Sequence, residues 1–247
     1  MDTLSPQALI FLGYALLLLP GLAVLSRGGE AETEGAHQED GAEGSRVSMY
    51  VGSLFVLGGL LTLSVLAGRE VGVELFSVRS LRAWDWLLAF VILGIAYATN
   101  AVTVSWMSEA ERRAGVAFIP QTRPEWTVFS LAALLGGIAE EAAYRGVVVV
   151  LLTRATGSAW VAVGLSVVAF AIGHAGQGRK AVVAVAFGAL TMHLLVELTN
   201  TLLLAMAVHV VYDLTAVAWG ARRIAREGVE ALVKRPAARD PGEGGGN

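Results

Sequence analysis

The chain has 247 residues, of which 55% are hydrophobic and 16% charged, and its mean hydropathy is +0.62. Soluble domains typically carry about 25% charged residues, so this composition predicts an integral membrane protein. No basic stripe with interleaved aromatic residues is present, which argues against nucleic-acid binding. The absence of cysteine excludes disulfides and thiolate chemistry. The formal net charge of −3 says little about partners, because one acidic segment dominates it.

Seven apolar segments follow one another along the chain. A bilayer core about 30 Å thick requires roughly 20 apolar residues in a helix, so these segments predict an all-α, polytopic bundle of about seven transmembrane helices. The first segment has no basic residues ahead of it and is interpreted as a transmembrane helix rather than a cleavable signal peptide. The predicted helices cover residues 7–26, 48–67, 84–107, 126–153, 158–175, 180–198 and 200–219.

The predicted helices divide the chain into three parts. Residues 1–125 contain the first three helices and an acidic, glycine-rich loop at 27–47, which is too poor in apolar residues to order itself. Residues 126–219 form a helical core, and residues 220–247 form a basic tail. Most lysines and arginines of the loops follow odd-numbered helices, so the positive-inside rule predicts a cytoplasmic C-terminus. The bias toward Ala, Gly, Val, Leu and Arg suggests the cytoplasmic membrane of a bacterium.

Two adjacent glutamates, Glu140 and Glu141, lie within the predicted span 126–153. A carboxylate at bilayer depth costs about 2.5–3.5 kcal/mol on insertion scales, so such residues are candidates for a functional site. Glu141 and Arg145 are four residues apart on one helix face and can pair, whereas Glu140 points about 100° away. We therefore predict a structural ion pair between Glu141 and Arg145, and a reactive carboxylate at Glu140.

Histidines occur in the later predicted spans as well. His174 ends the fifth helix, and His209 and Asp213 share one face of the seventh. Asp213 could orient the His209 tautomer, or both could present hydrogen bonds to a developing oxyanion. Glu140 could act as a general base on a water shared with a histidine. Alternatively, Glu140, His174 and His209 are an adequate ligand set for Zn²⁺ with an open position.

Three motifs in this region, in this order, resemble the CPBP family (CAAX protease and bacteriocin-processing, or Abi) of intramembrane proteases, which includes the type II CAAX prenyl endopeptidases. The family pattern is Glu-Glu-x-x-x-Arg, then Phe-x-x-x-His, then His-x-x-x-Asn or Asp. The matching segments here are Glu140 to Arg145, Phe170 to His174, and His209 to Asp213. The match covers residues 126–219, which would then be the catalytic core.

The resemblance implies roles for the matching residues. The first glutamate and the histidine of the second motif would activate water, and the last histidine with its Asn or Asp partner would support the oxyanion. This assigns catalysis to Glu140, His174, His209 and Asp213, with Glu141, Arg145 and Phe170 in support. Both a metal-dependent and a metal-free, glutamate-dependent mechanism are described for the family.

The resemblance implies an intramembrane endopeptidase that cuts a membrane-embedded or lipidated peptide or protein. Two other functions remain open. A proton- or ion-coupled transporter also uses intramembrane Glu, His and Arg, but it predicts an inverted repeat, and no convincing repeat is visible. A non-catalytic scaffold or immunity protein could keep the same residues for structure. His193 and Glu197 match no motif and are interpreted as a packing residue and an interfacial residue.

Overall fold

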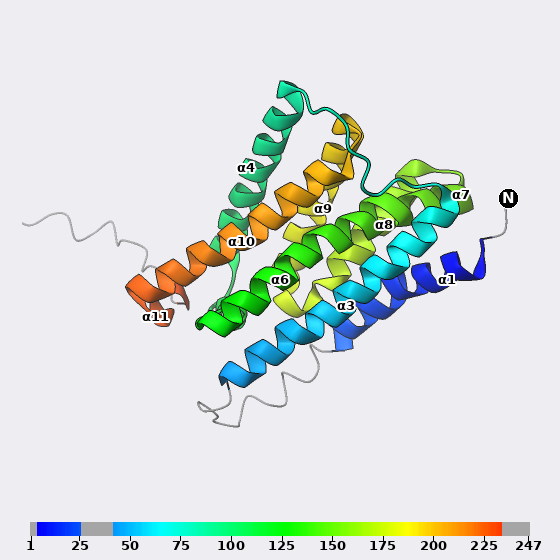
Figure 1. The fold of residues 1–247 in the computed structure, drawn as a ribbon. Coiled ribbons are helices and arrows are strands. Elements are labelled where there is room, and N and C mark those ends of the chain that lie inside the picture. Colours follow the sequence, from blue (N-terminus) through cyan, green and yellow to red (C-terminus); the bar gives the residue numbers. More distant parts are fainter. Residues whose placement is uncertain (1–3, 26–41, 234–247) are drawn as a thin grey trace, which may run out of the picture.

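The fold was analysed in a computed structural model that describes residues 4–25 and 42–233 (Figure 1). These residues form helices and connecting segments without strands. The first helix, α1 (Pro6–Gly13), continues through the π-helical η1 (Tyr14–Leu18) to Leu25. The remaining elements are α3 (Ala42–Val71), α4 (Ala83–Trp106), α5 (Glu109–Ala117), α6 (Arg123–Glu140), the π-helical η2 (Glu141–Val148), α7 (Val149–Thr156), α8 (Ala159–Gly173), the 3-10 turn η3 (Ala175–Gln177), α9 (Arg179–Thr199), α10 (Leu202–Glu227) and α11 (Val229–Val233).

The predicted fold class, an all-α polytopic membrane bundle, is confirmed, but the number of helices that could span a membrane differs. By length and composition, five helices of the described residues are long and apolar enough: Pro6–Leu25, Arg46–Val71, Ala83–Trp106, Arg179–Thr199 and Leu202–Glu227. The other two expected spans are helical but do not meet this standard. Apolar α8 has 15 residues, or roughly 22 Å, and the continuous helix α6–η2–α7 contains the buried charged pair.

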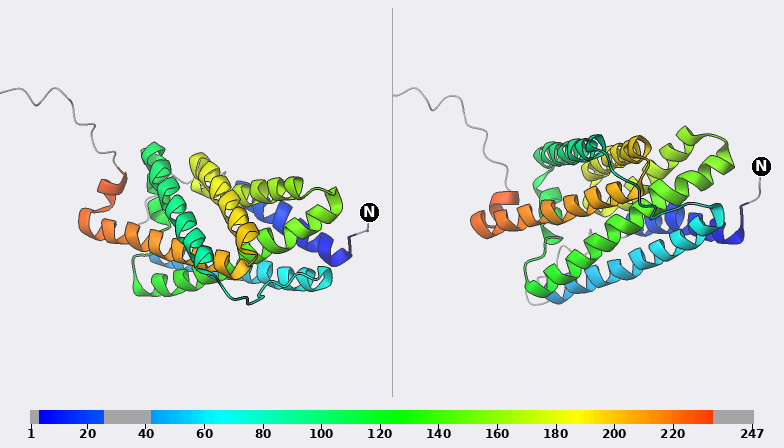
Figure 2. Two further views of the ribbon diagram at one scale, coloured as in Figure 1. Left: turned by 90° about the horizontal axis from the view of Figure 1, so that it is seen from above. Right: turned by 45° about the horizontal axis from the view of Figure 1, so that its top comes forward.

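The helices pack into a bundle in which α3, α6 and α10 lie side by side (Figure 1). α10 is antiparallel to α6, and its C-terminal part extends beyond the bundle (Figure 1). α4 and α9 pack together next to α10 (Figure 2), while η1 and α8 contact η2. The η2 segment therefore contacts helices from both halves of the chain.

Ion pairing extends α3 beyond its expected start. Residues 42–47 were predicted to belong to the acidic loop, but they form the first turns of α3; residues 26–41 of that loop lie outside the described residues. Arg46 Nε donates to Glu125 Oε1 at 2.8 Å. The other oxygen of Glu125 accepts from the backbone N–H groups of Gln121 at 2.6 Å and Thr122 at 3.1 Å. This network holds the start of α3 against the start of α6.

The predicted tail is also helical over its first part. α10 continues to Glu227 rather than ending at residue 219, and α11 follows it. Arg112 of α5 donates from Nε to the carbonyl of Val233 at 2.6 Å, which fixes α11 against α5. The expected tight turn between the last two long helices is confirmed, because Asn200 adopts the left-handed conformation with φ 49° and ψ 40°.

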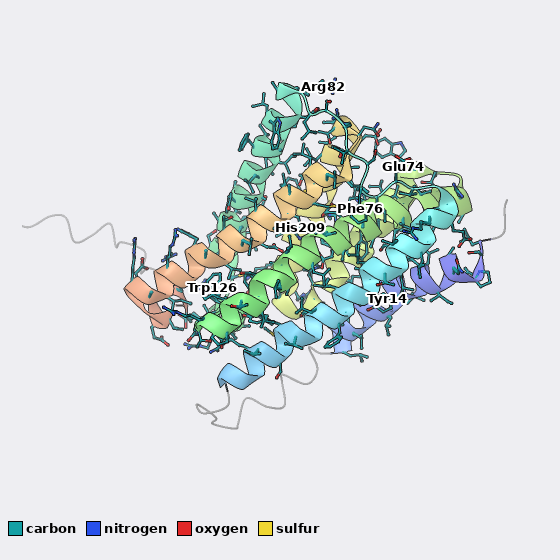
Figure 3. The ribbon with its side chains drawn as sticks, viewed as in Figure 1. Tyr14, Glu74, Phe76, Arg82, Trp126 and His209 are labelled. Carbon is teal, nitrogen blue, oxygen red and sulfur yellow. The ribbon has the colours of Figure 1, made fainter. Side chains whose placement is uncertain are left out.

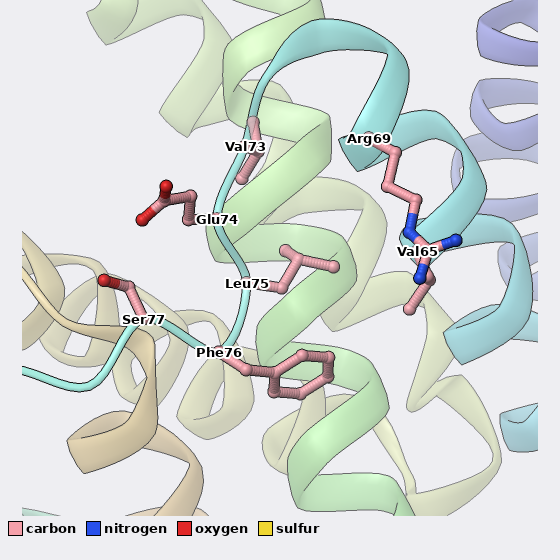
Figure 4. Close-up of a pocket in the computed structure, with 7 residues that line it drawn as sticks. All are labelled: Val65, Arg69, Val73, Glu74, Leu75, Phe76 and Ser77. Atoms are coloured by element: carbon pink, nitrogen blue, oxygen red, sulfur yellow. The ribbon is translucent and has the colours of Figure 1, made fainter.

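The segment between α3 and α4 covers one side of η2. Leu75 is buried there, and a β-carbon at Gly146 would lie 2.8 Å from Leu75 Cδ2 and 3.2 Å from Leu202 Cδ1. Figure 4 shows Leu75 and Glu74 pointing to opposite sides of this segment, beside a hollow of about 400 Å³. Glycine at position 146 thus allows the segment and the start of α10 to pack directly onto η2.

Candidate active site

Glu141 lies at the centre of the polar residues inside the bundle. Its side chain is fully buried, with 0% exposure. Oε1 lies 3.3 Å from Arg145 Nη1, so the expected ion pair is present. The same oxygen also lies 2.8 Å from Nδ1 of His209, a contact that sequence reasoning did not anticipate. One buried carboxylate oxygen thus connects the first and third sequence motifs.

The second ring nitrogen of His209 faces two carboxylates that are more accessible than that of Glu141. Nε2 lies 3.7 Å from Glu140 Oε2 and 3.5 Å from Asp213 Oδ2. The side chains of Glu140 and Asp213 are 20% and 34% exposed. Such separations are long for direct hydrogen bonds, and polar groups at this distance are commonly bridged by a water. His209, which Figure 3 places where α10 meets α6, therefore links a buried carboxylate to an accessible carboxylate pair.

Phe170 brings the second motif to the same place. Its ring centroid lies 4.6 Å from that of His174 and 6.5 Å from that of His209. The guanidinium of Arg145 lies over the Phe170 ring, 4.4 Å from its centroid, in a cation–π contact. His174 follows the last residue of α8, and its Nδ1 lies 2.9 Å from the carbonyl oxygen of Phe170. Hydrogen bonds and ring contacts thus connect all three sequence motifs.

A glycine allows the two helices that carry Glu141 and His209 to approach closely. A β-carbon at Gly137 would lie 2.5 Å from Val210 Cγ2 and 3.1 Å from the Val210 backbone nitrogen. Gly137 lies one turn before Glu141, and Val210 follows His209. Sequence reasoning did not identify Gly137, although the pair Gly136-Gly137 one turn before the glutamates was a visible signal.

Glu141 is the first residue of the π-helical segment η2, all of whose residues are buried. π-Helical turns are rare and often occur at functional sites. Contacts from outside the helix support this one. The Tyr144 hydroxyl donates to the carbonyl of Ala15 at 2.9 Å, and Ser166 donates to the carbonyl of Tyr144 at 2.8 Å. The conformation next to the site therefore depends on tertiary packing by η1 and α8.

The described side chains do not form a preassembled group of three metal ligands at the zinc site that was considered as an alternative. Within residues 4–25 and 42–233, no three His, Cys, Asp or Glu side chains form a group that could hold a metal ion. Nδ1 of His209 is bonded to Glu141, and Nδ1 of His174 faces the carbonyl of Phe170. Oε2 of Glu140 lies 3.7 Å from Nε2 of His209. The two histidine contacts occupy Nδ1 of both rings and leave Nε2 free, so the zinc alternative stays a prediction.

The fold and the site together define a helical integral membrane protein with a carboxylate–histidine centre between its later helices. Residues 122–215 match the family described as type II CAAX prenyl endopeptidase Rce1-like. The match confirms the resemblance in the three motifs and supports, in general terms, a CAAX-type intramembrane protease. No curated protein and no solved structure matches the chain.

Proposed function

We propose that the protein is an intramembrane endopeptidase that hydrolyses a peptide bond of a membrane-embedded or lipidated substrate, using a water activated by Glu140. One observation carries this proposal. Nε2 of His209 faces Glu140 Oε2 at 3.7 Å, while Nδ1 of the same ring is bonded to buried Glu141. The imidazole is therefore fixed in orientation, next to a carboxylate that can share a water or an oxyanion with it.

In the proposed reaction, the carboxylate of Glu140 removes a proton from water while the water oxygen attacks the carbonyl carbon. Nε2–H of His209 donates a hydrogen bond to the resulting oxyanion. In this role both ring nitrogens carry hydrogen, and Nδ1–H donates to Glu141. The proton held by Glu140 then passes to the leaving amide nitrogen as the carbon–nitrogen bond breaks. The mechanism requires neither a serine nor a cysteine nucleophile.

His174 and Asp213 complete the proposed centre. His174, held at Nδ1 by the Phe170 carbonyl, would help Glu140 to hold the water. Asp213 lies 3.5 Å from Nε2 of His209 and, with its carboxyl group protonated, would donate an O–H hydrogen bond to the same oxyanion. The substrate would reach the centre from the bilayer of a bacterial cytoplasmic membrane, with the C-terminus of the enzyme on the cytoplasmic side. This orientation follows from the distribution of lysine and arginine in the loops.

The test compares Glu140→Gln with wild type by mass spectrometry of membrane peptides from cells that express each form. Glu197→Gln is the matched control, because Glu197 is an exposed carboxylate on α9 that undergoes the same chemical change. We expect cleavage products in the wild type and in the control, and their loss in Glu140→Gln at equal protein levels. Unchanged products in Glu140→Gln would refute the proposal.

A further inference from the structure

The proposed chemistry leaves some buried polar atoms near the site unused. They are Oε2 of Glu141, Nε2 of His193 and, on Arg145, both Nε and Nη1; Nη1 lies 3.3 Å from Oε1 of Glu141. Each is inaccessible, and none has a hydrogen-bond partner among the described protein atoms. Buried polar groups are nearly always hydrogen-bonded, either to protein or to ordered water. Nη1 of Arg145 already faces Glu141 in the ion pair, so the other three atoms, on neighbouring side chains, require a shared explanation.

The three side chains converge on one place between η2 and α9. Arg145 is paired with Glu141 and also donates from Nη2 to the carbonyl of Ala189 at 3.4 Å. His193 lies four residues after Ala189 on α9, so both are on the helix face directed at Arg145. The guanidinium of Arg145 and the carboxylate of Glu141 are both close enough to His193 to interact with it electrostatically. His193, which matches none of the three motifs, thus belongs to the same polar cluster.

We propose that an ordered internal water binds between Glu141, Arg145 and His193, and that His193 acts through it as a positioning residue for Glu141. One water molecule can make a hydrogen bond to each of the three groups. Nε–H of Arg145 donates to the water oxygen, and the two water hydrogens are donated to Oε2 of Glu141 and Nε2 of His193. Buried waters typically make about three hydrogen bonds of this kind. His193 would then carry its own hydrogen on Nδ1.

The consequence concerns the geometry of the neighbouring site. Oε1 of Glu141 already contacts Arg145 and His209. A water on Oε2 would fix the second oxygen and so prevent rotation of the carboxylate. The orientation of His209 would then depend on His193, although His193 is not placed in contact with the substrate. This effect on activity rests on the proposed function, whereas the water site itself does not.

A structure of the full-length protein, determined at a resolution that shows ordered waters, tests the site directly. We expect density for a water within hydrogen-bonding distance of Glu141 Oε2, Arg145 Nε and His193 Nε2. We expect His193→Phe to lose this water and to lengthen the contact between Glu141 and His209. Direct bonds among the three wild-type groups, without a water, would overturn the inference.

Kinetics on a peptide whose cleavage depends on Glu140 test the positioning role. We expect His193→Phe to lower kcat roughly tenfold or more, as loss of supporting hydrogen bonds commonly does, with KM unchanged. His193→Gln, which can still bond the water, should stay close to wild type. Met192→Leu changes the adjacent buried residue of α9 and controls for packing. Wild-type kcat in His193→Phe would refute the positioning role, and a wild type without any activity would refute the proposed function while the density still decides the water site.

Discussion

Nδ1 of His209 lies 2.8 Å from Oε1 of Glu141, so the second of the two adjacent glutamates serves a histidine as well as an arginine. The two glutamates therefore differ in environment despite their adjacency. Glu141 is fully buried, whereas Glu140 is 20% exposed and faces the other nitrogen of the same imidazole. One carboxylate holds the ring, and the other is available for chemistry.

This difference predicts that the same substitution changes stability by different amounts at the two positions. Glu141→Gln should destabilise the purified protein by about 3–5 kcal/mol, because it leaves the buried charge of Arg145 without its partner. Glu140→Gln should change stability by less than about 1 kcal/mol, because Glu140 makes only a long, partly exposed contact. Thermal unfolding in detergent measures both. Equal losses of stability would contradict this division of roles.

Asp213 allows the two roles that sequence reasoning left open to be distinguished. Glu141 already fixes Nδ1 of His209, so Asp213 is not needed to orient the ring. We expect Asp213→Asn to retain most activity, because an amide can still hydrogen-bond in the oxyanion region. Asp213→Ala should lower kcat about 100-fold, the typical effect of removing one oxyanion contact. If Asp213→Asn is as inactive as Asp213→Ala, the carboxylate itself is required.

Neighbouring glycines on α6 provide a matched pair for testing the helix contact. Gly137→Ala would place its β-carbon 2.5 Å from Val210 Cγ2, whereas Gly136→Ala would meet only Leu57 Cδ1, at 3.5 Å. We expect Gly137→Ala to cost about 1–3 kcal/mol in stability, as overpacking does, and to reduce cleavage by separating Glu141 from His209. Gly136→Ala should be neutral or slightly stabilising. Unfolding and peptide cleavage, measured on both variants, decide between these outcomes.

The environment of Glu111 on α5 predicts that the stability of the protein depends on pH. The Ser108 backbone N–H and then the Lys180 side chain hydrogen-bond to this carboxylate and lower its pKa from the ordinary value of 4.5. A lowered pKa in the folded state stabilises the protein above pH 4.5, and the stabilisation is lost as pH falls through the folded pKa. The melting temperature of wild type should therefore exceed that of Glu111→Gln at neutral pH.

This difference in melting temperature should shrink as the pH is lowered below about 4.5. A difference that stays constant over the same range would show that Glu111 contributes through packing rather than through its charge. The Lys180 pairing partner is accessible enough for salt to weaken the contact. High salt should therefore reduce the difference at neutral pH.

Local geometry predicted some of these contacts from the sequence. The four-residue spacing indicated the pair Glu141–Arg145, and the left-handed preference of asparagine indicated the turn at Asn200. The bond between Glu141 and His209 joins residues 68 positions apart. It depends on how closely α6 and α10 approach at Gly137, which no local pattern specifies. The catalytic roles assigned to the motif residues stay predictions.

The hydropathy of the sequence did not predict the short helices α5 and α11. α5 is amphipathic and α11 has only five residues, so neither resembles a span. Polar contacts between residues far apart in the sequence hold them, such as those of Arg112 with the Val233 carbonyl and of Glu111 with Lys180. The start of α3 likewise depends on Arg46 finding Glu125, which follows 79 residues later. Such contacts require the fold to be known before they can be recognised.

The packing of Leu75 on Gly146 couples the segment after α3 to the polar centre. Gly146 directly follows Arg145 within η2, where tertiary contacts support the π-helical conformation. Displacing Leu75 would remove part of this support and allow η2 to rewind, which would turn Arg145 relative to Glu141. A substitution or a binding event on this remote segment can therefore alter the polar centre without contacting any of its polar groups.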